Sequence, residues 1–159
     1  MLSRFRNKKI PDIYLFISHF LDHFIILVFA KAAYNAGQDI GLTYGETIQL
    51  ARWGFILFGV ASPIVARVAD IFSRSITIVV FHFGIGISSN IVSFSHTSFH
   101  LVLGLSSTVF FSAIFHPIGI AMLLKKKERI CLRLGINGLF GNMGVASAPL
   151  ITSYYSFWH

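Results

Sequence analysis

Charged residues are scarce in this sequence. Asp, Glu, Lys and Arg make up 12% of the 159 residues, whereas an ordinary soluble domain contains roughly 25%. Hydrophobic residues make up 55%, and Phe alone occurs 17 times. This composition almost excludes a soluble globular fold, and it excludes a disordered chain because disordered segments are poor in aromatic residues. Lipid is therefore the expected solvent for most of the surface.

Acidic residues and cysteine are scarcer still, with 6 Asp and Glu and 1 Cys against 13 Lys and Arg. The lone Cys131 excludes an intramolecular disulfide. The net charge of +7 would suggest a nucleic-acid partner in a soluble protein. Here the basic residues form two clusters beside apolar runs, so we expect a lipid bilayer as partner and no nucleic acid. The clusters are Arg4, Arg6, Lys8 and Lys9, and Lys125, Lys126, Lys127, Arg129 and Arg133.

Five stretches are apolar and long enough to span a bilayer, which takes about 20 residues. A cleaved signal peptide is an alternative for the first stretch, but its apolar run is too long and Asp22 and His23 interrupt it. The loops are short, so we expect a single membrane domain over residues 1–159, folded as an all-α polytopic helix bundle. The expected spans are residues 12–34, 47–68, 76–94, 99–124 and 134–158.

The positions of Lys and Arg predict the orientation of the bundle. Four lie in the N-terminal tail, Arg67 and Arg74 lie around the end of the second span, and five lie between the last two spans. The loops on the other side, 35–46 and 95–97, contain none, and Lys31 and Arg52 are expected within about one turn of the outer span ends. The positive-inside rule predicts a cytoplasmic N-terminus in the plasma (inner) membrane.

A short motif, Ala66-Arg67-Val68-Ala69-Asp70-Ile71-Phe72-Ser73-Arg74, follows the second span. Asp70 and Arg74 can pair with each other or with a facing helix end, and Ala66 and Ser73 are small enough for close helix approach. The motif resembles the loop between helices two and three of the major facilitator superfamily, Gly-x-x-x-Asp-Arg-x-Gly-Arg-Arg. Ala66 and Ser73 replace its glycines, and positions 71 and 75 lack its basic residues. A plain basic turn is the alternative.

The fifth span carries a second pattern of small residues with one proline. The corresponding helix of the superfamily's proton antiporters has Gly-Pro and further glycines at these positions, which here are Gly135, Gly144, Ala148, Pro149, Thr152 and Ser153. Such a stripe allows close packing and the proline kinks the helix, although a generic packing face is the alternative. His116-Pro117 with Gly119 on the fourth span also resembles the fosmidomycin-resistance branch of the superfamily.

His19, Asp22 and His23 lie on one face of the first span. A charged Asp near the bilayer centre costs about 2.5–3.5 kcal/mol, so we expect Asp22 to face a partner or water and to serve proton coupling. The resemblance implies that the first and fourth spans line a central cavity, with His116 facing the same space. The alternative for the histidines is hydrogen bonding within the bundle or a place at the interface.

The resemblance covers the first five of the superfamily's usual twelve helices. It implies a truncated secondary transporter whose parent moves a small solute, with proton-coupled efflux as its mode and a complementary C-terminal half as its partner. The rival hypothesis is a non-transporting membrane subunit, or a degraded gene product, that assembles with another membrane protein. We expect no enzyme, no cofactor and no metal site, since His82, His96, His100 and His159 lack ligand spacing and catalytic motifs are missing.

Overall fold

The computed structural model describes residues 11–71, 73–126 and 128–158; the N-terminal basic cluster and Lys127 lie outside them. The described residues form an all-helical bundle, which confirms the predicted fold class. All five helices are long and apolar enough to cross a membrane, so the chain is an integral membrane protein. They are α2 (Asp12–Asp39), α3 (Tyr44–Ile71), α4 (Arg74–Ser93), α5 (Ser98–Leu124) and α6 (Ile130–Trp158).

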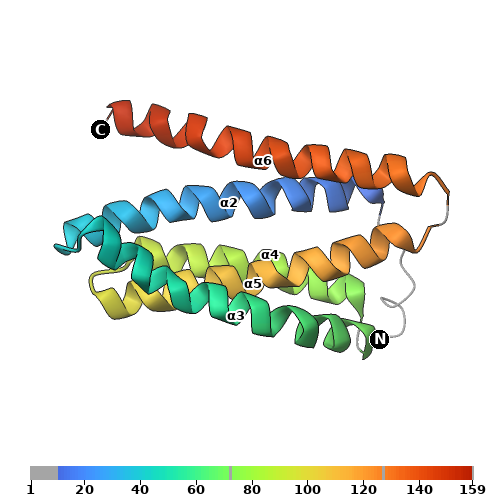
Figure 1. The fold of residues 1–159 in the computed structure, drawn as a ribbon, viewed down its shortest axis with the longest axis horizontal. Helices are drawn as coiled ribbons and strands as arrows, with labels where there is room; N and C mark the ends of the chain where they lie inside the picture. Colours follow the sequence, from blue (N-terminus) through green and yellow to red (C-terminus); the bar gives the residue numbers. More distant parts are fainter. Residues whose placement is uncertain (1–10, 72, 127, 159) are drawn as a thin grey trace.

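Successive helices run in opposite directions along the long axis of the bundle (Figure 1). The most extensive packing joins α2 to α6, α3 to α5 and α4 to α5. The helix α2 also packs on α5 and thereby connects the α2–α6 pair to the group of α3, α4 and α5 (Figure 1). The α2–α5 interface is therefore the seam between the two groups of helices.

Side-chain caps fix where several helices begin. At the start of α3, Glu46 N–H donates to Thr43 Oγ1 and Thr43 N–H donates to Glu46 Oε2, at 3.3 and 2.8 Å, which is a capping box. Ser73 and Thr97 accept hydrogen bonds from backbone N–H groups in the first turns of α4 and α5. Gly41 follows α2 with φ of 82°, a left-handed conformation that glycine adopts without strain.

The first two helices are longer than the spans predicted from the sequence. The predicted loop 35–46 is wrong, since residues 35–39 are helical and α3 already begins at Tyr44. Lys31 and Arg52 each lie eight residues, about two turns, inside their helices, so both helices continue beyond the outer ends of the predicted spans. Hydropathy identifies only the part of a helix that crosses hydrocarbon. The helix ends are set by other residues: Gly41 follows the end of α2, and Thr43 caps the start of α3.

The apolar core forms three clusters: one joins α2 to α4 and α5, one joins α2 to α5, and the largest lies where α3, α4 and α5 meet. Its largest members are Phe81, Phe115 and Ile118, each at most 2% exposed. Large apolar side chains also cover the outer surface, where Phe55, Phe83 and Leu150 are about 70% exposed. An apolar surface of this kind is expected for a protein whose outer face contacts lipid tails.

An ion-pair network closes one end of the bundle, beside the turn between α5 and α6. Arg133 Nε lies 2.5 Å from Asp12 Oδ2, and its Nη1 donates to the carbonyls of Leu123 and Lys126. Lys126 Nζ contacts the same carboxylate at 2.8 Å. Arg133 is a buried residue of α6, and its side chain joins α2 to the last turn of α5. The prediction that the basic cluster 125–133 faces lipid headgroups is therefore wrong for Arg133.

Candidate functional site

The most deeply buried acid in the described residues is Asp22, on the face of α2 that meets α5. Its side chain is 0% exposed, and Ser112 Oγ of α5 donates a hydrogen bond to Asp22 Oδ1. His116 Nε2, one turn further along α5, lies 3.2 Å from Asp22 Oδ2, an ion-pair distance that lacks hydrogen-bond geometry. Asp22 is ten residues from the start of α2, about 15 Å along the axis, so it lies well inside a helix long enough to cross the bilayer.

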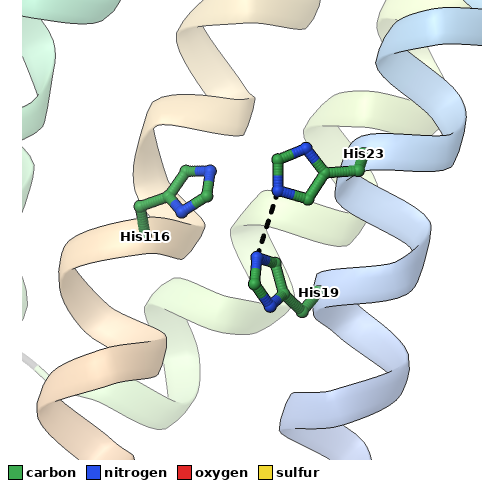
Figure 2. Close-up of side chains that lie close together, drawn as sticks. All are labelled: His19, His23 and His116. Carbon is green, nitrogen blue, oxygen red and sulfur yellow. Dashed lines mark hydrogen bonds between the residues drawn. The ribbon is translucent and has the colours of Figure 1, made fainter. Parts of the chain in front are cut away.

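Three histidine rings lie close together, and we call His19, His23 and His116 the histidine triad (Figure 2); His116 is the member that contacts the Asp22 carboxylate. The ring centroids of His19 and His23 are 4.9 Å apart, and those two rings lie 5.5 and 5.4 Å from the ring of His116. His19 Nε2 and His23 Nε2 are separated by 3.1 Å. All three residues are partly exposed, so the triad is reachable from outside the chain while Asp22 behind it is sealed.

The helix α6 holds the ring of His19 in place. His19 Nδ1 donates to the backbone carbonyl of Asn137 across the α2–α6 interface at 2.7 Å, because a carbonyl can only accept. Gly141, one turn along α6, faces the same ring: a Cβ at this position would lie 2.8 Å from His19 Nε2. The absence of a side chain at Gly141 therefore leaves the space that the imidazole occupies.

The predicted motif after α3 forms a local contact. Arg74 Nη2 and Nε bind Asp70 Oδ1 at 2.7 and 3.0 Å, and Arg74 Nη1 donates to the carbonyl of Ala121 on α5 at 3.3 Å. Ser73 is the buried N-cap of α4, and Ala66 is half-buried. This arrangement ties the end of α3 to α5, at the end of the bundle that also carries the Asp12–Arg133 network (Figure 1).

The predicted residues of the fifth span divide into two groups. Gly144 lies directly against α2, where an added Cβ would collide with the backbone carbonyl of Phe20, and Ala148 is buried. Gly135 and Pro149 are exposed, and an added Cβ at Gly135 would meet nothing within 4 Å. The close approach of α2 and α6 therefore depends on Gly144 and Ala148.

Reasoning from the sequence missed three residues of the site: Ser112, Asn137 and Gly141. Ser112 precedes His116 by four residues, a spacing that puts both on one helix face and could have identified it. Asn137 and Gly141 contact His19 only because α6 packs on α2 in one particular register. That register is a property of two helices and is not contained in the periodicity of either one.

Comparisons with protein-family models, with curated proteins and with solved structures give no match for this chain. The likeness to the major facilitator superfamily therefore depends on the sequence motifs alone. The site itself offers a buried carboxylate, a hydroxyl donor and three imidazoles inside a membrane bundle. Such groups can bind and exchange protons, or hold a cation, at a depth where ions are otherwise unstable.

Proposed function

We propose that this chain forms the amino-terminal helices of a proton-coupled secondary transporter of the major facilitator type, oriented with its N-terminus in the cytoplasm of the plasma (inner) membrane. The observation that carries the proposal is Asp22, a fully buried carboxylate beside His116 at the α2–α5 seam. An ionisable side chain at this depth is costly, and in membrane proteins such groups mark ion and proton pathways.

The packing of the helices gives independent support. In the major facilitator architecture, two three-helix repeats of inverted topology are related by a pseudo-two-fold axis. That axis would exchange α2 with α5 and α3 with α6, so packing of α2 on α6 should be mirrored by packing of α5 on α3. These are two of the three most extensive interfaces of the bundle. The exchanged helices also run in opposite directions, as inversion requires (Figure 1).

The distribution of charge supports the proposed orientation. Arg67, Arg74, Lys125, Lys126 and Arg129 lie near one end of the bundle, at the α3–α4 and α5–α6 connections. The opposite connections, 40–43 and 94–97, contain no Lys or Arg. Cytoplasmic loops carry an excess of basic residues, so the end with the basic residues would face the cytoplasm.

A proton-coupling role for Asp22 is tested by the substitution Asp22→Asn, which keeps the size of the side chain and removes its titration. The chain is placed in everted membrane vesicles with a complementary carboxyl-terminal half on a second chain. A pH-sensitive dye reports whether any of a panel of small solutes discharges the proton gradient. We expect discharge by at least one solute, its loss in Asp22→Asn, and a smaller reduction in His19→Ala.

The matched control is Asp39→Asn, which changes an exposed acid at the far end of the same helix and should leave the discharge unchanged. Unchanged coupling in Asp22→Asn would leave Asp22 a structural role only. Absence of discharge with every solute, although both halves assemble, would favour a non-transporting membrane subunit. The coding DNA that follows this chain discriminates further, because a transporter needs the remaining helices to be encoded nearby.

A further inference from the structure

The histidine triad brings three imidazole rings from α2 and α5 together within the described helix bundle. One ring nitrogen from each member of the histidine triad can be chosen so that all three lie within 4.8 Å of one another. Tetrahedral Zn²⁺ with Zn–N bonds of about 2.0–2.1 Å places its nitrogen ligands about 3.3 Å apart. The Nε2 atoms of His19 and His23 are already 3.1 Å apart. Small side-chain rotations, moving nitrogens by at most about 1.5 Å, bring the third ring to the same spacing.

The hydrogen bonds of the triad leave a nitrogen lone pair directed into it. His19 Nδ1 carries the hydrogen that it donates to the Asn137 carbonyl, so in the neutral ring His19 Nε2 has a free lone pair. In the structure that lone pair accepts a hydrogen bond from His23 Nε2. A metal ion would replace this single shared proton. A histidine ligand held through its other ring nitrogen by a backbone carbonyl is the usual outer-shell arrangement of protein metal sites.

The carboxylate of Asp22 supplies the negative charge that a buried cation needs. Its Oδ1 accepts from Ser112, while its Oδ2 is completely buried and has no hydrogen-bond donor among the described residues. Oδ2 lies 3.2 Å from His116 Nε2, beside the triad. An unpaired buried carboxylate oxygen next to three imidazoles gives the site a negative charge that a bound cation would balance.

We propose that the histidine triad, supported by Asp22, binds one divalent transition-metal cation such as Zn²⁺ or Co²⁺. Imidazole nitrogen is the ligand of choice for Zn²⁺, Co²⁺, Ni²⁺ and Cu²⁺, whereas Mg²⁺ and Ca²⁺ require oxygen ligands. All three rings are partly exposed, so the five described helices do not enclose the triad completely. Binding does not depend on the proposed transport activity, because every ligand comes from α2 and α5 of this chain.

The test is a metal titration of the full chain, purified in detergent without a polyhistidine tag. Zn²⁺ binding is measured by competition with a chromophoric chelator, and Co²⁺ binding by the intense visible absorption of tetrahedral cobalt. We expect one ion per chain. His23→Gln and His116→Gln should each weaken Zn²⁺ binding by at least about tenfold and abolish the tetrahedral Co²⁺ spectrum. Mg²⁺ should not compete.

Two further variants locate the site. His100→Gln changes an exposed histidine at the start of α5 and should bind Zn²⁺ as tightly as the unmodified chain. Gly141→Ala displaces the ring of His19 without removing a ligand, so it should weaken binding with the helix content unchanged. His23→Gln is the mildest triad variant, because among the described residues the ring of His23 forms a hydrogen bond with His19 alone. Equal Zn²⁺ affinity in the unmodified chain and a folded His23→Gln, or loss of binding in His100→Gln alone, would overturn the proposal.

Discussion

At the scale of single residues, the two Asp–Arg pairs near the same end of the bundle differ sharply in burial. The Arg133 side chain is 10% exposed and donates to two backbone carbonyls as well as to Asp12, which is 23% exposed, whereas Arg74 is 35% exposed and its partner Asp70 is 61% exposed. Loss of Arg133 would remove the hydrogen bonds to two backbone carbonyls and leave Asp12 with Lys126 alone among the described residues, while an exposed pair contributes little because solvent screens it. Burial therefore decides which of the two pairs stabilises the fold.

We expect Arg133→Ala to lower the free energy of unfolding by about 2–4 kcal/mol, and Arg74→Ala by less than about 1 kcal/mol. The measurement is denaturant-induced unfolding of each variant in detergent micelles, followed by circular dichroism. Both substitutions replace arginine with alanine, so the difference between them reports the burial of Arg133 together with its additional backbone hydrogen bond. Equal losses for the two variants would show that Arg133 is not the anchor between α2 and α5 that its contacts indicate.

At the scale of helices, the close approach of α2 and α6 rests on Gly144. A Cβ there would lie 3.1 Å from the backbone nitrogen of Phe24 and closer still to the carbonyl oxygen of Phe20, and backbone atoms cannot move aside as a flexible side chain can. Gly138, on the same helix, has nothing within 4 Å of such a Cβ. Gly144 is therefore a point of contact with α2, whereas Gly138 faces open space.

We expect Gly144→Ala to lower the melting temperature of the chain in detergent, with a larger loss in Gly144→Leu, since both force α6 away from α2. Gly138→Ala should leave the melting temperature unchanged or raise it slightly, because alanine favours a helix more than glycine by about 1 kcal/mol. Thermal unfolding followed by circular dichroism separates the variants. A stable Gly144→Leu would mean that α6 does not pack on Phe20 and Phe24.

The number and approximate position of the five helices could be predicted from apolar runs because hydrocarbon thickness sets a minimum length. The helix ends could not be predicted in this way, because α2 continues to the turn at Gly41 and α3 begins at the Thr43 cap, both beyond the apolar stretches. The spacing of His19, Asp22 and His23 put them on one face of α2. The proximity of Ser112 and Gly141 to these residues depends on how separate helices pack, which no single stretch of sequence determines.

At the scale of the whole molecule, the proposed topology makes a prediction along the entire chain. Basic residues near one end and their absence from the opposite connections predict an inside N-terminus and an outside C-terminus. Reporter fusions at Asn7, Asp39, Ser73, His96, Lys126 and His159 should therefore alternate between the two sides of the membrane. A cytoplasmic signal from the fusion at His159 would contradict this topology.

The five described helices form one bundle, in which α5 packs on every other helix. Alternating access requires one bundle to rock against another around a central site. The triad and Asp22 lie at the seam of a single bundle, so under the proposed function a second, different bundle would supply the opposing wall of a transport pathway. A symmetric pair of identical chains would place a copy of the same surface there, which does not reproduce a different half.

The most direct test of this account is solute flux through liposomes that contain the purified chain, with and without a separately expressed complementary half. Uptake of the solute found to discharge the proton gradient in the vesicle assay is followed under an imposed pH gradient. We predict no saturable, gradient-dependent flux for the chain alone and its appearance when the second half is added. Saturable flux from the 159-residue chain by itself would contradict the account and make this chain a minimal transporter.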